Sequence, residues 1–291
     1  MHRLLPVLLQ VKLPNWEFPG SAVFFSSISL GAIALLSGCA LVQSPTERVE
    51  TIAKEAGMAE VALQDRRLRG FAKASAGARL TVYIESDGAP WISRDQPPYD
   101  PTPIKPVVMH MAAADASASV AYLGRPCQYL SERELDNCDP ALWTLGRYSE
   151  DAVAASQAAV DLLKRRAGAQ TINLVGYSGG GAMAALVAAR RQDVACLVTL
   201  AAPLDTNAWA DAIGVTRLRL SLNPADYAER LMRVPQTHFV GARDITVPAG
   251  SIRRFIEKTP AAKVLTLERF THTCCWEDEW KELRNRSCLV E

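Results

Sequence analysis

The feature that most constrains the fold is a serine between glycines, placed where two different sequence patterns meet. Residues 171–175 read TINLV, an apolar and β-branched run typical of a buried strand. Residues 179–191 are mostly small and apolar and predict a helix. The segment 176–180, GYSGG, matches the pattern G-x-S-x-G, so the chain must turn sharply from strand to helix at Ser178. Glycine on both sides of the serine relieves the crowding of backbone atoms that this turn creates.

Strand-like and helix-like segments alternate along most of the chain. We expect strands at 80–85, 119–123, 171–175, 194–201, 238–240 and 264–267, and helices at 106–114, 150–166, 179–191, 250–258 and 276–284. Strands separated by such helices predict an α/β fold with a mostly parallel central sheet and helices on both faces. The segment 203–235 between two of the strands predicts a small cap. Active sites in these sheets lie at the carboxyl ends of the strands.

A serine nucleophile needs a base that accepts its proton and an acid that orients the base. The chain has four histidines. His272 follows the strand-like run 264–270 in a loop, and it is the expected base. His2 lies in the N-terminal segment, His110 precedes the serine, and His238 falls inside a strand-like run.

The acid is expected in a loop after the preceding strand. Asp244 follows the run HFVG and precedes Pro248, and this segment resembles the G-x-x-D-x-x-V-P acid loop of the α/β-hydrolases. The order serine, acid, histidine is also the order found in that family. Asp205, which follows the run VACLVTL, is the alternative acid, because some hydrolases use that position.

The resemblance to the α/β-hydrolase family covers roughly residues 60–285. It implies the α/β-hydrolase fold and a catalytic triad of Ser178, Asp244 and His272. The segments VYIESDG, YLGRPCQY, RYSE, GYSGGGA, SLNP and HTCCWE are also similar to a group of uncharacterised bacterial α/β-hydrolase lipoproteins.

The same resemblance indicates where an oxyanion would be bound. Residues 86–91, SDGAPW, resemble the GDGxxW variant of the loop that completes the oxyanion hole, with Ser86 in place of the first glycine. The implied donors are the backbone N–H groups of Gly179 and Asp87, with Gly88 next. An ordinary Asp-Gly turn is the alternative interpretation of this loop.

The N-terminal segment differs from the rest of the chain. Residues 21–36 form an uncharged apolar run that is short for a membrane span and suits a signal peptide. It ends in LSGC at 36–39, which resembles the lipobox of bacterial lipoproteins, whose cysteine carries the lipid. We therefore expect a signal peptide at 1–38, a lipid on Cys39, a tether and N-terminal segment at 39–59 and a hydrolase domain at 60–291. The alternative for the apolar run is a membrane anchor or a buried helix.

This N-terminus predicts a lipid-anchored protein of the bacterial cell envelope. Ala40 after the lipobox implies the outer membrane, with the protein facing the periplasm. Export would place the other six cysteines in an oxidising compartment, where disulfides form. We expect one between Cys127 and Cys138, which flank a polar loop; Cys288 is expected to pair with Cys274 or Cys275, and Cys196 to stay a buried thiol. A zinc site is the alternative, although the sequence has no CxxC pair with a nearby histidine.

Charge and motifs together narrow the function. Lysine and arginine number 32 against 31 aspartate and glutamate, a balance that gives no field to attract nucleic acid. We expect a serine hydrolase, either a carboxylesterase or a lipase-like enzyme, acting on a small-molecule or lipid ester without a cofactor or metal. A serine peptidase or amidase on the same fold, and a non-catalytic envelope-binding lipoprotein, are the alternatives.

Overall fold

The computed structural model describes residues 43–73, 77–93 and 95–290. The expected signal peptide at 1–38 and the expected lipidation site Cys39 lie outside the described residues. Within the described ranges, no helix is long and apolar enough to cross a membrane.

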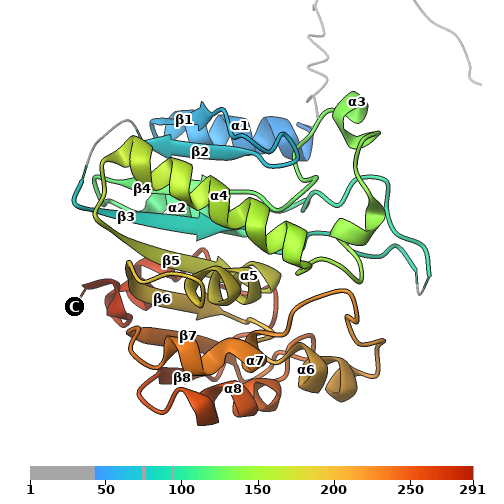
Figure 1. The fold of residues 1–291 in the computed structure, drawn as a ribbon, viewed down its shortest axis with the longest axis vertical. Coiled ribbons are helices and arrows are strands. Elements are labelled where there is room, and N and C mark those ends of the chain that lie inside the picture. Colours follow the sequence, from blue (N-terminus) through green and yellow to red (C-terminus); the bar gives the residue numbers. More distant parts are fainter. Residues whose placement is uncertain (1–42, 74–76, 94, 291) are drawn as a thin grey trace, which may run out of the picture. The chain divides into compact units, whose positions relative to one another are not determined.

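The strands form one eight-stranded sheet in the order β1-β2-β4-β3-β5-β6-β7-β8 (Figure 1). β2 runs antiparallel to β1 and to β4, and each later pair of neighbours is parallel. The expected α/β class with a mostly parallel sheet is therefore confirmed. The strands are β1 Met58–Val61, β2 Gly70–Lys73, β3 Arg79–Ile84, β4 Val120–Leu123, β5 Thr171–Tyr177, β6 Val194–Leu200, β7 Gln236–Gly241 and β8 Lys263–Leu267. The helices are α1 Pro45–Glu55, α2 Val107–Ala114, α3 Glu132–Leu135, α4 Glu150–Ala167, α5 Gly179–Ala188, α6 Thr206–Ile213, α7 Pro224–Tyr227, α8 Arg253–Lys258 and α9 Trp280–Asn285, with 3-10 turns at Pro140–Leu142, Ala228–Leu231, Ala249–Ile252 and Cys288–Val290.

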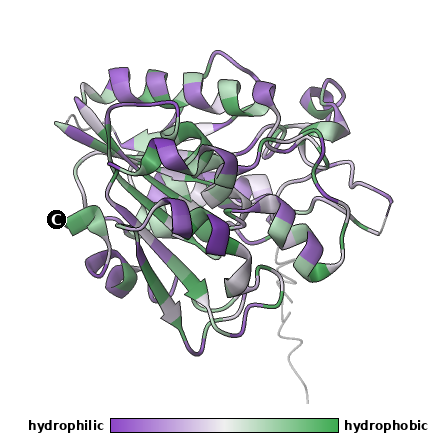
Figure 2. Ribbon diagram, turned by 60° about the horizontal axis from the view of Figure 1, so that its bottom comes forward, coloured by the Kyte–Doolittle hydropathy of each residue, from purple (hydrophilic) through white to green (hydrophobic). Residues whose placement is uncertain are grey.

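Helices cover both faces of the sheet because its strands are apolar on both sides. Along β3, Leu80 and Val82 belong to the core shared with α4 and α5, whereas Tyr83 belongs to the opposite core with α2 and α9. The ring of Tyr83 meets that of Trp280 edge-on, with centroids 5.8 Å apart. Figure 2 shows hydrophobic residues on the central strands and hydrophilic residues along the outer sides of surface helices. Side chains that alternate between two cores are the expected consequence of the two-residue period of a strand.

The fold begins earlier than residue 60, where we expected the domain to start. Ser44 and Glu47 form a capping box that opens α1, and Val49 and Ala53 are buried against the sheet side that carries α2. β1 then pairs along its whole length with β2. The described part of the segment 39–59 is therefore mostly folded rather than a tether; the spacing of Ser44 and Glu47 marks the start of the helix in the sequence, whereas the strand has no clear signal. α1 covers the antiparallel end of the sheet.

Three disulfides join the six cysteines of the described chain. Cys127 and Cys138 are bonded as expected. The expectations of a free thiol at Cys196 and of a bond from Cys288 to Cys274 or Cys275 were wrong, because Cys196 pairs with Cys288. The 3-10 turn that carries Cys288 is docked on the sheet, where the Cys288 N–H donates to Thr237 Oγ1 at 3.1 Å, and this docking brings the two sulfurs together. The third disulfide joins the adjacent residues Cys274 and Cys275.

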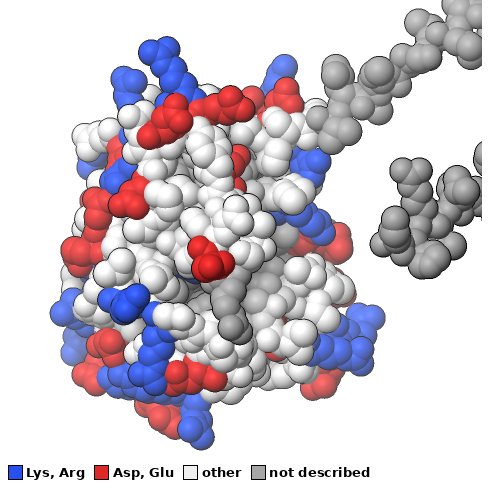
Figure 3. Space-filling model, turned by 90° about the vertical axis from the view of Figure 1, so that its right-hand side faces the viewer, with Lys and Arg blue, Asp and Glu red and all other residues white. Residues whose placement is uncertain are grey.

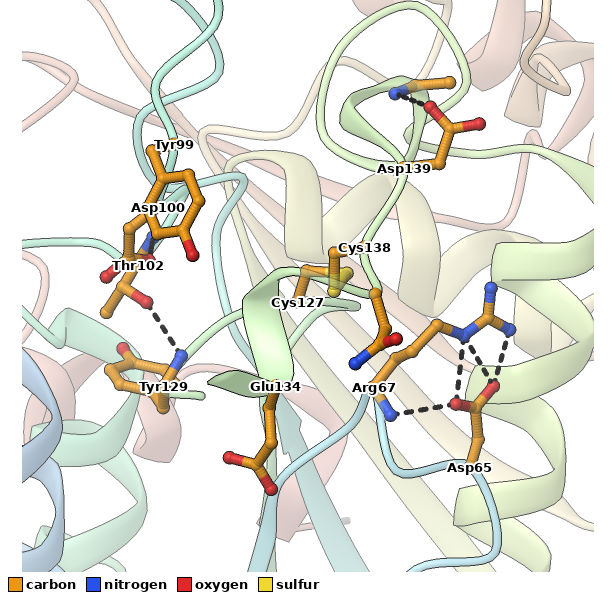
Figure 4. The surroundings of a disulfide bond; sticks show 12 residues. Asp65, Arg67, Tyr99, Asp100, Thr102, Cys127, Tyr129, Glu134, Cys138 and Asp139 are labelled. Carbon is orange, nitrogen blue, oxygen red and sulfur yellow. Dashed lines mark hydrogen bonds and ion pairs between the residues drawn. A yellow bond between two sulfur atoms is a disulfide. The ribbon is translucent and has the colours of Figure 1, made fainter. Parts of the chain in front are cut away.

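The Cys127–Cys138 disulfide fastens the insertion between β4 and α4 (Figure 4). Next to it, the Cys127 N–H donates to the carbonyl of Arg67 at 2.7 Å, and Arg67 in turn forms ion pairs with Asp65 and Asp151. The insertion is thus attached to the loop between β1 and β2, and this attachment holds the residues that follow β4 near the carboxyl end of β3.

Candidate active site

Ser178 occupies a strained turn between β5 and α5. Its backbone has φ 53° and ψ −127°, a conformation that a residue with a side chain rarely adopts. A Cβ on Gly176 would collide with the carbonyl of Gly180, and a Cβ on Gly180 would collide with the backbone of Ile84 at the end of β3. The two glycines therefore let β5, β3 and α5 approach closely enough to hold the serine above the sheet.

Ser178, His272 and Asp244 form one hydrogen-bonded chain. Ser178 Oγ lies 3.0 Å from Nε2 of His272, and Nδ1 of His272 lies 2.8 Å from Oδ2 of Asp244. The other carboxylate oxygen of Asp244 accepts the N–H groups of Thr246 and Val247 at 2.9 and 2.8 Å. Each of the three residues follows a strand, namely β5, β7 or β8, at the carboxyl end of the sheet.

The backbone of His272 is fixed by two aromatic side chains that we did not single out in the sequence. Tyr177 donates its hydroxyl to the His272 carbonyl at 2.5 Å, and Trp276 donates its indole N–H to the same oxygen at 2.9 Å. Burial raises the pKa of Tyr177, which therefore stays a donor. Tyr177 occupies the first variable position of the G-x-S-x-G segment, and Trp276 is the fifth residue of the segment HTCCWE, so both lie within motifs identified in the sequence.

Asp205, the alternative acid, and His238, the other histidine after Ser178, have other partners. Asp205 accepts the N–H groups of Asn207 and Ala208 at 3.1 and 3.3 Å and caps α6. His238 lies inside β7, where its Nδ1 is 2.8 Å from Thr199 Oγ1 and where burial lowers its pKa to about 3. Among the described contacts, neither residue touches the chain of Ser178, His272 and Asp244.

The expected oxyanion donors lie beside the serine. The N–H groups of Gly179, the first residue of α5, and of Asp87 make no hydrogen bond with another described residue. The two residues are neighbours, because a Cβ on Gly179 would collide with the Asp87 carboxylate. Gly88 has φ 68° and lies against the backbone of Pro101, so it provides the turn that presents this loop.

The Asp87 side chain is the centre of a buried charge cluster. Its carboxylate accepts from Arg125 Nη1 at 2.8 Å, from Arg147 Nη1 at 2.9 Å and from the Tyr148 hydroxyl at 2.9 Å. Burial by itself would raise the pKa of Asp87, but the charges of Arg147 and Arg125 outweigh it and hold that pKa below its ordinary value. Arg125 was not singled out in the sequence.

A cavity of about 400 Å³ opens beside Ser178 and His272. Its walls are mainly apolar and include Pro103, Trp209 and Val247. Trp209 comes from the cap and donates its indole N–H to the carbonyl of Thr246 at 2.8 Å, which joins the cap to the loop of Asp244. Figure 3 shows the face at the carboxyl ends of the strands, where uncharged residues cover most of the centre and charged residues gather toward the rim. The described residues contain no group of three His, Cys, Asp or Glu side chains that could hold a metal ion.

Comparisons with known proteins give the architecture a family context. A family model described as the alpha/beta hydrolase fold matches residues 130–243. A solved esterase from Pyrococcus furiosus has a TM-score of 0.56 at 14% identity, covering 81% of this chain and 94% of that protein. Est1E from Butyrivibrio proteoclasticus has the same TM-score and identity, covering 81% of this chain and all of Est1E.

Peptidases with the same architecture are also similar. The acylaminoacyl peptidase of Pyrococcus horikoshii has a TM-score of 0.54 at 13% identity, and the match covers 79% of this chain but 41% of the peptidase. No curated protein sequence matches. The order of the strands, the serine turn between β5 and α5 and the likeness to these solved structures lead to one conclusion: the chain has the α/β-hydrolase fold.

Proposed function

We propose that this protein is a serine hydrolase that cleaves ester bonds through an acyl-enzyme on Ser178. The observation that carries the proposal is the hydrogen-bonded chain from Ser178 Oγ through His272 to Asp244, with distances of 3.0 and 2.8 Å, at the wall of a cavity. A nucleophile, a base within hydrogen-bond reach and an acid that orients the base are the components of covalent hydrolysis.

The reaction follows from the positions of these atoms. His272 Nε2 accepts the proton of Ser178 Oγ as Oγ attacks the ester carbonyl carbon, and Asp244 stabilises the imidazolium that forms. The N–H groups of Gly179 and Asp87 donate to the oxyanion of the tetrahedral intermediate. His272 then gives its proton to the leaving alkoxide, which departs as an alcohol. Water, deprotonated by His272, attacks the acyl-enzyme, and His272 returns that proton to Ser178 Oγ as the acid leaves.

Ester rather than amide cleavage is favoured by the extent of the structural likeness. The two esterases match over nearly their whole length, whereas the acylaminoacyl peptidase has more than half of its length outside the match. The same triad can serve a serine peptidase or amidase, so amide cleavage is the second candidate.

We further propose a lipid on Cys39 and a location in the bacterial cell envelope. The apolar run at 21–36 and the LSGC tetrapeptide support this proposal. To test this proposal, the full wild-type chain and the Cys39→Ala control are produced in a bacterium, and their intact masses and membrane fractions are compared. We expect the wild type alone to carry the added mass of a diacylglycerol group and to fractionate with the outer membrane. An unmodified wild-type chain would contradict the proposal.

A fluorophosphonate probe tests the catalytic proposal directly. Intact mass should show one covalent adduct on the wild type and on Asp205→Asn, and none on Ser178→Ala or His272→Ala. A folded wild type without an adduct would refute the hydrolase and favour a binding lipoprotein. Rates with 4-nitrophenyl butyrate and with butyryl 4-nitroanilide, which share an acyl group, then separate ester from amide preference.

A further inference from the structure

Arg147 has an unused hydrogen-bond donor at the active-site cavity. Its Nε donates to the carbonyl of Thr144 at 2.8 Å, and its Nη1 donates to Asp87 at 2.9 Å. Its Nη2 has no hydrogen-bond partner among the described residues. This atom is not fully buried, because it is absent from the set of inaccessible polar atoms without a partner. The side chain is only 5% exposed, and Arg147 lines the cavity. Nη2 is therefore held in place by its neighbours and accessible from the cavity.

The cluster around this atom carries a surplus positive charge. Two guanidinium groups, of Arg125 and Arg147, share the single carboxylate of Asp87. Lys105 is the other described cation that lines the cavity, and Glu277 forms an ion pair with it. The carboxylate of Asp244 accepts from His272 and from two backbone N–H groups, so it provides no direct partner for Arg147.

We infer that Arg147 binds an anionic oxoacid group of the substrate, a carboxylate or a phosphate, carried close to the ester that is cleaved. This inference rests on the proposed function and names its substrate class. A guanidinium presents planar N–H donors that match the oxygens of both groups, and such charge-assisted bonds are stronger than neutral ones. In a mostly buried site, an anion on the substrate offsets the positive charge that Asp87 leaves unbalanced.

The position of Arg147 limits where the anion sits on the substrate. Arg147 contacts the Asp87 carboxylate, and that carboxylate lies against Gly179, whose N–H is the proposed oxyanion donor. Only one side chain therefore separates the guanidinium from the oxyanion site. Most of the remaining wall is apolar, with Pro103, Trp209 and Val247. The substrate that fits is an ester whose carbonyl and anionic group are joined by a short apolar spacer.

Matched esters test this preference. 4-Nitrophenyl hemiglutarate carries a carboxylate, 4-nitrophenyl 4-phosphonobutyrate carries a phosphonate at a similar position, and 4-nitrophenyl valerate is the neutral control. We expect the wild type to show a kcat/KM for one or both anionic esters at least about tenfold above that for the valerate, the scale of one charge-assisted hydrogen bond. The anionic ester with the larger kcat/KM relative to the valerate identifies whether Arg147 prefers a carboxylate or a phosphate-like group. A wild type that prefers the neutral ester would overturn the inference.

Arg125 provides a matched control for Arg147. Both arginines bind Asp87, but only Arg147 lines the cavity. Arg147→Gln should remove most of the anionic preference, and Arg147→Lys should keep part of it. Arg125→Gln should lower the rates with all three esters by the same factor and leave their ratios unchanged. If Arg147→Gln and the wild type had the same ratio of anionic to neutral ester kcat/KM, the inference would be refuted, even if Arg147→Gln and Arg125→Gln both lose activity.

Binding without turnover separates the inference from the hydrolase proposal. Calorimetric titration of Ser178→Ala with the hemiglutarate and with the valerate measures recognition when no ester is cleaved. Tighter binding of the hemiglutarate by at least about tenfold, lost in Ser178→Ala/Arg147→Gln, supports the anion site even if the wild type proves inactive. Equal binding of both esters, in a wild type that labels with fluorophosphonate, would refute the anion site and leave the hydrolase standing.

Discussion

Replacing Asp244 by asparagine tests how the imidazole of His272 is oriented. Oδ1 of Asp244 accepts two backbone N–H groups, of Thr246 and Val247, and Oδ2 faces His272 Nδ1 at 2.8 Å. Asparagine has one acceptor oxygen, and the two backbone donors hold that oxygen at the Oδ1 position. Its amide NH2 then faces Nδ1 and donates to it, so the imidazole must carry its own proton on Nε2.

A proton on Nε2 blocks the base, because that atom faces Ser178 Oγ and must accept its proton. In serine hydrolase triads the wrong tautomer lowers kcat by about 10⁴-fold. That factor corresponds to about 5.4 kcal/mol of transition-state stabilisation. Because the two N–H bonds to the loop survive, we expect the melting temperature and KM of Asp244→Asn to stay close to those of the wild type. The assay is kcat with 4-nitrophenyl butyrate at pH 7.5.

Asp205→Asn is the matched control, since Asp205 is also buried, also follows a strand and was the alternative acid. Its kcat should equal that of the wild type and its melting temperature should stay close to it, because asparagine caps a helix N-terminus about as well as aspartate. A kcat for Asp244→Asn within tenfold of the wild type would refute the tautomer argument. A loss confined to Asp205→Asn would transfer the acid role to that residue.

Three further predictions concern the surroundings of the site. Gly179→Ala should lower kcat at least about 100-fold, the scale for loss of one oxyanion donor, because its Cβ displaces the Asp87 carboxylate; circular dichroism checks that the variant folds, and an active variant would count against the donor pair. Burial raises the pKa of Glu85 from 4.5 to about 7, so the folded state holds a proton that the unfolded chain releases, and stability should fall by about 3 kcal/mol as pH rises from 4.5 through 7. Urea unfolding at pH 5 and pH 8 should show this fall in the wild type and not in Glu85→Gln; parallel pH dependence in both would contradict the assignment. Removing Cys196–Cys288, whose cysteines are 92 positions apart, should cost about 4.6 kcal/mol, against about 3 kcal/mol for Cys127–Cys138, whose cysteines are 11 apart. Thermal unfolding of the two double serine variants measures this order, and the reverse order would be inconsistent with loop-closure entropy.

The parts of the fold that could be predicted are those with a local cause. β5 and α5 could be predicted because the G-x-S-x-G segment needs a strand before it and a helix after it. Asp244 and His272 could be selected because each follows a strand, and the carboxyl ends of parallel strands meet at one edge. The sheet class followed from the alternation of strands and helices.

The missed parts depend on contacts between distant segments. β1 and β2 read MAEV and GFAK, which are not continuous apolar runs like the equally short β4, and their pairing defines them. The bond between Cys196 and Cys288 requires knowing that the final 3-10 turn docks beside β6. The charge cluster around Asp87 includes Arg125, which is 38 residues away in the sequence; Arg125 lies within the segment YLGRPCQY, but that segment does not show which of its residues reaches Asp87.

The spacing of the disulfides also sets an order in which they can form during synthesis. Cys127 and Cys138 are 11 residues apart, so their bond can close while most of the later sheet has not yet been made. Cys196 must wait for 92 further residues, including β7, α8, β8 and α9, before its partner exists. In the interval its thiol is exposed to other cysteines of the growing chain. A cell that makes this protein therefore benefits from an isomerase that corrects early pairings of Cys196 with Cys127 or Cys138.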